Sequence, residues 1–174
     1  MAQDAQGHSL SGANADVADH IDLAVRAFTL NYGDANAHLT AALEASPECA
    51  MAGLLRGWLL ALSNDPAQIG KIGGLLAGLP ETGMNERERS HLAALRLAGS
   101  GRWPSAVAAL DRHLMSFPHD LAAHQCALRL DGYLGRFHRG AGRSARALPF
   151  WSKDQPGRSI LMSFYGFAVS ELGD

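Results

Sequence analysis

Gly99, Ser100 and Gly101 open the stretch "AGSGRWPSAVAALDRHLMSFPHD" with a spacing that resembles the start of a phosphate-binding loop. A dinucleotide loop needs a preceding strand, and a P-loop also needs a lysine followed by a hydroxyl residue. Here the preceding residues have a helical pattern, and Arg102 and Trp103 follow in place of a lysine. Glycine closes the last turn of many helices because it adopts a positive φ without strain. The pattern therefore predicts a helix end, and no nucleotide site.

Histidine, cysteine and acidic side chains are the next groups that could do chemistry. Asp120 and His124 are one helical turn apart, as are Asp16 and His20, but such a lone pair is typical of a surface interaction or a cap. Cys126 follows His124 by two residues, which places the two on different helix faces. No HExxH motif or GxSxG elbow occurs, so we expect no catalytic residue, no metal and no cofactor. The histidines are His8, His20, His38, His91, His113, His119, His124 and His138.

A basic stretch over residues 136–146, which begins with Arg136, follows this region. Arg139, Arg143 and Arg146 share one helical face, and no acid intervenes between Asp131 and Asp154. Such a face could hold the phosphates of a nucleic acid or an acidic peptide. We interpret it as a solvated outer face, because the whole chain has a net charge of −2. Anion binding is kept as an alternative, and nucleic acid is not the expected partner.

The composition is that of one globular domain. The chain has 174 residues, of which 47% are hydrophobic and 18% charged. Residues 1–14 lack an apolar run and are predicted to be a flexible N-terminal tail, so the domain spans residues 15–174. The longest apolar run, residues 51–62, is too short for a membrane span and contains Arg56, so no membrane partner is expected. Cys49 and Cys126 lie in apolar segments and are expected to be buried free thiols of a cytoplasmic protein.

Charge is divided unevenly along the chain. Residues 1–85 carry nine acids and three bases, and residues 86–174 carry eight acids and twelve bases. The two halves therefore have formal charges of −6 and +4. This asymmetry is consistent with head-to-tail attraction between molecules or with a partner bound at one end.

Alanine and leucine are the most frequent residues, and apolar residues recur at helical spacing, so the fold class is expected to be all-α. Asp34, Asp65 and Asp120 are placed to cap helices. Prolines at 47, 80, 118 and 156 end helical stretches at spacings of 33, 38 and 38 residues, which are typical of stacked helical hairpins. The expected helices span residues 15–32, 35–46, 48–63, 66–79, 85–100, 104–117, 120–135, 139–150 and 157–172.

The third expected helix pair has the clearest repeat pattern. Small residues fall where two helices must approach closely, and a glycine, an aromatic residue and a proline mark the turn and the end of the unit. These residues are Ala94, Gly101, Trp103, Ala106, Leu114 and Pro118. Their order resembles a tetratricopeptide repeat, which implies a right-handed superhelix of antiparallel helical hairpins.

Three longer stretches resemble one particular family. They are "LNYGDANAHLTAALEASPECAMAGLLRGWLLALSNDP", "ERSHLAALRLAGSGRWPSAVAALDRHLMSFPHDLAAHQCALRLDGYLG" and "SARALPFWSKDQPGRSILMSFYGFAVSELGD". Together they are similar to the tetratricopeptide repeat protein 38 family over residues 15–174. Members of that family are longer, so the resemblance implies a short or truncated member. It implies no assigned activity for particular residues.

Stacked repeats curve, and the first helix of each pair lines the inside of the curve. Projected onto this sequence, the groove-lining residues are Leu54, Trp58, His91, Leu95, Gln125, Arg129, Phe164 and Phe167. We expect this groove to bind a protein or peptide without catalysis. One alternative is an enzyme or enzyme subunit with a small-molecule pocket at His91, Gln125 and Arg129. Self-association through the C-terminal helix, with Ile160, Phe164 and Phe167 exposed, is also compatible with the sequence.

Overall fold

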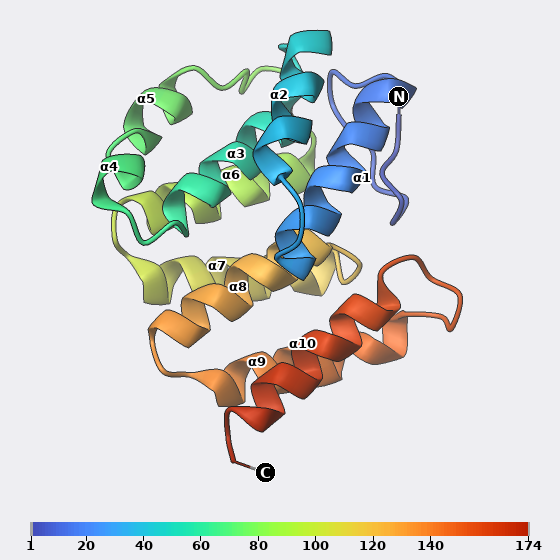
Figure 1. Ribbon diagram of the computed structural model, residues 1–174, viewed down its shortest axis with the longest axis vertical. Coiled ribbons are helices and arrows are strands. Elements are labelled where there is room, and N and C mark those ends of the chain that lie inside the picture. Colours follow the sequence, from blue (N-terminus) through green and yellow to red (C-terminus); the bar gives the residue numbers. More distant parts are fainter. Residues whose placement is uncertain (1, 174) are drawn as a thin grey trace.

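The computed structural model describes residues 2–173, and this part of the chain is all-α (Figure 1). No strand occurs in it, although Gln3 and Ser9 form one isolated antiparallel bridge. The helices are α1 (Ala15–Leu30), α2 (Ala35–Ala45), α3 (Ala50–Ala61), α4 (Pro66–Ile69), α5 (Ile72–Ala77), α6 (Glu86–Gly99), α7 (Trp103–Ser116), α8 (Leu121–Tyr133), α9 (Phe137–Ala147) and α10 (Arg158–Ser170), with a 3-10 turn η1 (Leu148–Phe150) between the last two.

Aspartates begin three of the helices, as their spacing predicts. The carboxylates of Asp34, Asp65 and Asp120 accept hydrogen bonds from backbone N–H groups in the first turns of α2, α4 and α8, at 2.9 to 3.1 Å. Each bond satisfies an N–H group that has no partner within its own helix. The positions at which these three helices begin are therefore determined by residues close by in the sequence.

The Gly99–Gly101 loop is the junction of two helices. Helix α6 ends at Gly99, Gly101 has a φ of +74°, and α7 begins at Trp103. The backbone N–H of Arg102 bonds back to the carbonyl of Leu97 at 3.0 Å, which closes the end of α6. The predicted helix end is confirmed.

Two expected helices differ from the structure. The helix expected over 66–79 is divided into α4 and α5, because Gly70, Gly73, Gly74 and Gly78 weaken a continuous helix. The helix expected over 139–150 begins two residues earlier, at Phe137, and its last turn tightens into η1 around Pro149. The other boundaries agree with the prediction within about two residues.

Successive helices pack on one another through most of the chain. Helix α1 packs on α2, α6 on α7, α7 on α8, and α9 on α10, while α1 also reaches across to α8. Ala94 in α6 and Ala106 in α7 are fully buried. At Gly140, a Cβ atom would lie 2.8 Å from a methyl carbon of Leu128, so glycine allows α9 to approach α8. Figure 1 shows the succession running from α6 in the upper half to α10 at the bottom.

Residues 2–13 are packed against the helices, which corrects the expectation of a flexible tail. Leu10 has no exposed surface, and the carboxylate of Asp4 is buried beside Arg87. The backbone N–H of Ser11 donates to the carboxylate of Glu88 at 2.9 Å. Leu10 and the buried carboxylate of Asp4 thus anchor this segment, and Ala2 and Ala13 also pack against the core. We call residues 2–13 the N-terminal segment.

Cys49 and Cys126 are free and buried, as expected. Within residues 2–173 no helix combines the length and apolar character that crossing a bilayer requires.

Candidate functional site

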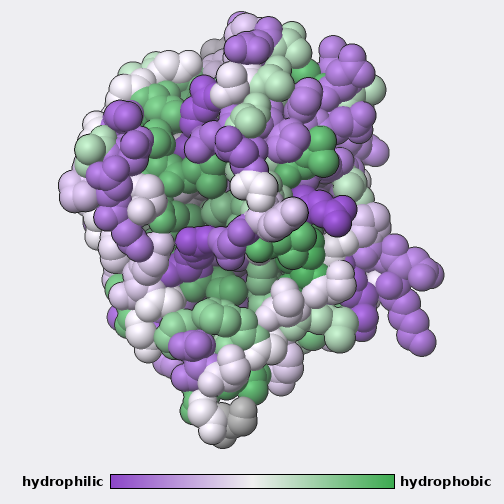
Figure 2. Space-filling model, in the orientation of Figure 1, coloured by the Kyte–Doolittle hydropathy of each residue, from purple (hydrophilic) through white to green (hydrophobic). Residues whose placement is uncertain are grey.

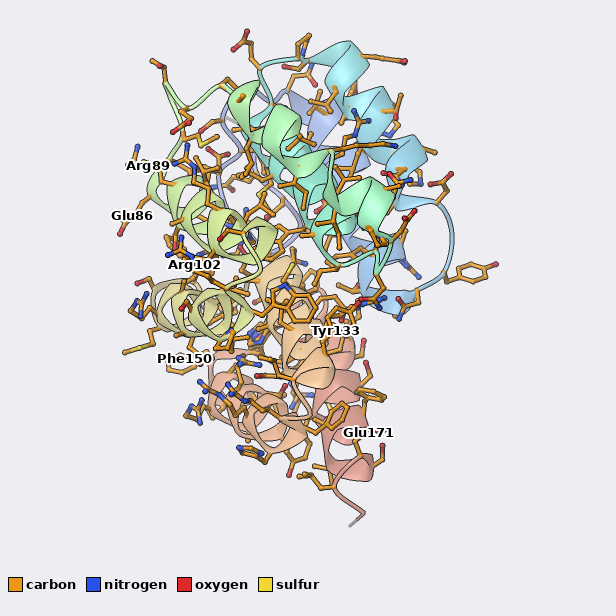
Figure 3. All side chains as sticks on the ribbon, turned by 90° about the vertical axis from the view of Figure 1, so that its left-hand side faces the viewer. Glu86, Arg89, Arg102, Tyr133, Phe150 and Glu171 are labelled. Carbon is orange, nitrogen blue, oxygen red and sulfur yellow. The ribbon has the colours of Figure 1, made fainter. Side chains whose placement is uncertain are left out.

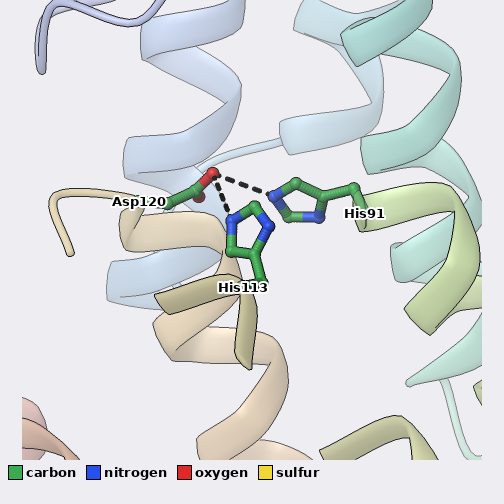
Figure 4. Close-up of side chains that lie close together, drawn as sticks. All are labelled: His91, His113 and Asp120. Carbon is green, nitrogen blue, oxygen red and sulfur yellow. Dashed lines mark hydrogen bonds and ion pairs between the residues drawn. The ribbon is translucent and has the colours of Figure 1, made fainter. Parts of the chain in front are cut away.

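A buried polar cluster centres on Asp120, the N-cap of α8. Its Oδ1 atom accepts the N–H of Ala123 at 3.0 Å, so capping uses one carboxylate oxygen. The Oδ2 atom lies 3.0 Å from Nε2 of His91 in α6 and 3.2 Å from Nε2 of His113 in α7 (Figure 4). All three side chains are without exposed surface. One aspartate therefore joins three helices.

Arg87 joins this cluster to the N-terminal segment. Its Nε atom donates to Oδ2 of Asp120, and its Nη1 atom donates to Oδ2 of Asp4 at 2.9 Å. Arg87 lies in the first turn of α6, where a capping box formed by Asn85 and Glu88 fixes the helix start. The guanidinium is thus held between two carboxylates in a site that water barely reaches. Burial opposes the charge, but Asp120 and Asp4 together raise the pKa of Arg87.

Hydrogen bonds define the protonation of His91. The indole Nε1–H of Trp58 donates to Nδ1 of His91 at 3.1 Å, so Nδ1 carries a lone pair and Nε2 carries the proton. Burial lowers the pKa of His91 to about 4, against the opposing effect of Asp120, and the imidazole is therefore neutral near pH 7. Burial also opposes ionisation of Asp120, yet Arg87 and the bonds from both histidines hold the pKa of this carboxyl well below its usual value.

The donor set of this cluster does not fit a metal ion. One ligand atom from each of His91, His113 and Asp120 lies within 4.8 Å of the others, which is close enough for a metal. A metal would need the lone pair of His91 Nε2, but the Trp58 bond places the proton there. Arg87 also adds a fixed positive charge on the same carboxylate oxygen. The arrangement is that of a hydrogen-bonded charge network that holds helices together.

A groove on another part of the molecule is apolar and open. Its volume is ≈ 600 Å³, and its lining residues come from the end of α1, from α8, from the start of α9 and from α10. Phe137 and Phe167 meet edge to face there, with ring centroids 5.9 Å apart. The lining residues are Thr29, Asn31, Gln125, Leu128, Arg129, Gly132, Tyr133, Phe137, Ser163, Phe164 and Phe167. We call this the α8–α10 groove.

Hydrophobic surface gathers where α8 and α10 face the viewer in the space-filling view (Figure 2). Tyr133 lies at the end of α8 and Glu171 just after α10, on one side of the lower half of the molecule, whereas Phe150 lies on the other (Figure 3). Among the described residues that line the groove, Arg129 alone carries a formal charge. Its guanidinium donates to Asn31 and lies 6.0 Å from the ring centroid of Phe28.

The structure divides the groove residues expected from the sequence into two sets. Gln125, Arg129, Phe164 and Phe167 line the α8–α10 groove, but Gln125 and Phe164 are almost completely buried in its wall, which corrects the expected exposure of Phe164. The other four have no exposed surface, so no partner touches them in this conformation, and this part of the expectation is corrected. They are Leu54, Trp58, His91 and Leu95.

The small-molecule pocket expected at His91, Gln125 and Arg129 is also corrected. His91 bonds to Asp120 and Trp58 in the core, whereas Gln125 donates to the Phe28 carbonyl at 3.3 Å at the groove. The three residues therefore do not surround one cavity.

The arginine face on α9 is partly neutralised. Arg143 is buried and donates to Asp111 and to Asp131 at 2.7 Å each. Arg139 donates to the other oxygen of Asp111, also at 2.7 Å. Only Arg146 of the three is an exposed residue. The expected continuous anion-binding face is therefore corrected, because acids far away in the sequence pair with two of its arginines.

The side chains that bond to Asp120 could not be predicted from the sequence, because they belong to other helices. His113 precedes it by seven residues, and His91 and Arg87 by 29 and 33. Of the two interpretations of the Asp120–His124 spacing, the cap is confirmed, because Asp120 caps α8, whereas the surface interaction is wrong, because both residues are buried and His124 bonds to the Pro118 carbonyl at 3.1 Å. The sequence predicts only the role of Asp120 as the N-cap of a helix.

No protein-family model matches this chain, and no solved structure matches it significantly. A functional assignment must therefore rest on the geometry of the groove and of the buried cluster.

Proposed function

We propose that this chain is a non-catalytic helical-repeat scaffold that binds a protein or peptide in the α8–α10 groove. The observation that carries the proposal is the groove itself, which is hydrophobic, ≈ 600 Å³ in volume and lined by aromatic side chains from three helices. Grooves of this kind accept the apolar face of an amphipathic helix. The half-buried Arg129 at its edge favours a ligand that carries a carboxylate beside its apolar residues.

The repeat architecture is part of this proposal. Helices α6 and α7 pack on each other and each contains a fully buried alanine, Ala94 and Ala106, while the rings of Trp103 and Tyr133 of the next helix lie 5.5 Å apart in a tilted arrangement. These contacts support a tetratricopeptide-like hairpin, in line with the resemblance to the tetratricopeptide repeat protein 38 family. The first helix of such a hairpin faces the concave side. Gln125 and Arg129 lie on α8, which is the first helix of the following pair.

Binding is favoured over catalysis by the chemistry of the groove. Its lining holds hydroxyl, amide and phenol groups and one arginine, but no carboxylate, histidine or cysteine among the described residues. The buried histidines that could act as acids or bases are enclosed elsewhere in the core. A general acid or base must reach its substrate, and these cannot.

A peptide selection tests the proposal. A library of random 16-residue peptides is selected on the immobilised full chain, and enriched peptides are titrated by fluorescence anisotropy. We expect Phe167→Glu to weaken binding at least about tenfold, because it places a charge among the groove aromatics. Phe150→Glu is the matched control, since Phe150 is also exposed but does not line the groove.

Three results would contradict the proposal. They are the absence of enriched peptides, equal loss of binding in both variants, and no loss in either. If only a second copy of the chain binds, and Phe167→Glu abolishes that dimer on sizing, the groove is a self-association site and the heterologous-peptide proposal is wrong.

A further inference from the structure

Another cavity lies where α7 and α9 meet. Its volume is ≈ 400 Å³, and its wall is formed by residues of α7 and α9 together with Pro118, His124 and Phe150. Figure 3 shows Phe150 on the opposite side of the lower half of the molecule from Tyr133, which lines the α8–α10 groove. The cavity and the groove have no lining residue in common. We call this the α7–α9 cavity.

Part of the wall of the α7–α9 cavity is apolar. Leu114 and Ala147 are buried there, whereas Met115 is 84% exposed and Phe150 is 64% exposed. Single exposed apolar side chains are common on protein surfaces, but here two large ones border the same cavity. An apolar group that rests against them would remove hydrophobic surface from water.

The charged part of the wall has an excess of positive charge. Its charged residues are Asp111 of α7 and Arg143 and Arg146 of α9. Asp111 already accepts hydrogen bonds from Arg143 and Arg139, at 2.7 Å each. The ion pairs of α9 within residues 2–173 involve these two arginines but not Arg146, which is an exposed residue. An anion is therefore the ligand charge that the cavity favours.

Two buried nitrogen atoms of wall residues have no hydrogen-bond partner within residues 2–173. Arg143 donates through Nε to Asp111 and through Nη2 to Asp131, but its Nη1 atom has no acceptor. His124 donates through Nε2 to the Pro118 carbonyl, so its Nδ1 atom has a lone pair without a donor. Water does not reach either atom. Buried polar groups nearly always have a partner, so these two indicate a bound group that supplies an acceptor and a donor.

We propose that the α7–α9 cavity binds a small organic acid that has a carboxylate, a hydroxyl group and an apolar body. The carboxylate binds to Arg146 and to Nη1 of Arg143. The hydroxyl donates to Nδ1 of His124, and the apolar body lies against Met115 and Phe150. Burial lowers the pKa of His124 to about 4, so the ring is neutral near pH 7 and Nδ1 remains an acceptor. This site does not depend on peptide binding in the α8–α10 groove.

An NMR titration of the wild-type chain tests the ligand class. The probe is phenyllactate, which has all three features, and phenylpropanol is the matched compound without a carboxylate. We expect phenyllactate to shift the backbone amide signals of α9 and the Nε–H signal of Arg143, with a Kd below about 1 mM. Phenylpropanol should bind at least about tenfold more weakly, because the arginines then lack an anion. Phenylpropanoate lacks only the hydroxyl and should bind at least about threefold more weakly than phenyllactate.

Variants of three arginines locate the site. Arg146→Ala removes an arginine of the cavity wall and should weaken phenyllactate binding at least about fivefold. Arg112→Ala is the matched control, because Arg112 is an exposed arginine of α7 that does not line the cavity. Arg129→Ala changes the α8–α10 groove instead. Both of these variants should bind phenyllactate as the wild-type chain does.

Four results would overturn the inference. The first is the absence of saturable shifts, which would mean that an enclosed water completes Arg143 and Asp131, whose Oδ1 atom also lacks a partner within residues 2–173. The second is equal binding of phenyllactate and phenylpropanol. The third is an equal effect of Arg146→Ala and Arg112→Ala. The fourth is loss of phenyllactate binding with Arg129→Ala alone, which would place the acid in the α8–α10 groove and leave the proposal of peptide binding there to its own test.

Discussion

The surface beside α6 and the α8–α10 groove differ in how the chain completes them. Beside α6, buried charges are paired with one another and covered by the chain's own N-terminal segment. At the groove, apolar side chains from α9 and α10 remain in contact with solvent, and Phe167 is 48% exposed. Buried charge is tolerated only when paired, whereas exposed apolar surface can persist until a partner covers it. The first region is therefore expected to contribute most to stability, and the second is the one to which the proposal of partner binding applies.

Removal of Asp120 should have the largest effect on stability. Asp120→Ala leaves Arg87 with one carboxylate and leaves two buried imidazole Nε2 atoms without their acceptor. We expect the free energy of unfolding to fall by about 3 to 5 kcal/mol, as for other broken buried ion pairs. Urea denaturation at pH 7 measures it. Asp111→Ala is the control, because it removes a partly exposed carboxylate and leaves the buried Arg143 its second partner, Asp131. Equal losses in the two variants would contradict a special role for the buried cluster.

Acid should also destabilise the fold. Burial lowers the pKa of His91 and of His124 to about 4, whereas an unfolded chain gives each a pKa near 6.5. Below pH 6.5 the unfolded state therefore binds protons that the folded state does not, and stability falls until about pH 4. Between pH 7 and pH 5 each histidine should contribute a loss of roughly 2 kcal/mol.

Urea denaturation of the wild-type chain at the two pH values measures this slope. His124→Gln should reduce it by about half, because one of the two titrating groups is gone. His138→Gln should leave it unchanged, since His138 is exposed. An unfolding free energy that is the same at pH 7 and pH 5 would show that neither histidine is held neutral by the fold.

Asp4→Ala should cost less than Asp120→Ala. Arg87 loses one acceptor but keeps Asp120, so we expect a loss of about 1 to 3 kcal/mol. The amides of the N-terminal segment should exchange faster, while those of α8 change only with global stability. Gln3→Ala, at an exposed neighbouring position, serves as the control. A loss as large as that of Asp120→Ala would mean that the N-terminal segment and the buried polar cluster unfold as one cooperative unit.

Phe167→Ser should have the smallest effect on stability. Because about half of the side chain is already in water, we expect the free energy of unfolding to change by less than about 1 kcal/mol. Peptide binding in the groove should still be lost. Thermal unfolding and anisotropy on the same sample compare the two. A variant that unfolds several degrees lower would assign Phe167 to the core and weaken the distinction between the two regions.

Much of the fold can be predicted because its signals are local. Aspartate caps, prolines and the positive φ of Gly101 act over a few residues, so helix ends can be placed from the sequence. The division of residues 66–79 is not predicted, since the pattern of apolar residues continues through glycines that break the helix. The anchoring of residues 2–13 is not predicted either, because it depends on Leu10 and Asp4 meeting distant helices.

The residues of the groove and of the charge network are harder to predict from the sequence than the helices are. Gln125, Arg129, Phe164 and Phe167 can be assigned to the groove from repeat geometry. The same geometry assigns Trp58 and His91 to it, but these two bond to each other in the core. Helical periodicity gives the face on which a residue lies but not what covers that face. The charge network depends on the packed structure, because its members come from α6, α7, α8 and the N-terminal segment.

A hydrogen-exchange footprint of a selected peptide on the wild-type chain tests most directly whether partners bind in the α8–α10 groove. We expect slower exchange of amides in α8 and α10 on binding, with no change in α7, which contributes no residue to the groove. The same footprint should disappear with Phe167→Glu and persist with Phe150→Glu. Protection that falls on α7 and η1, or a footprint that is the same in both variants, would contradict the assignment of partner binding to the α8–α10 groove.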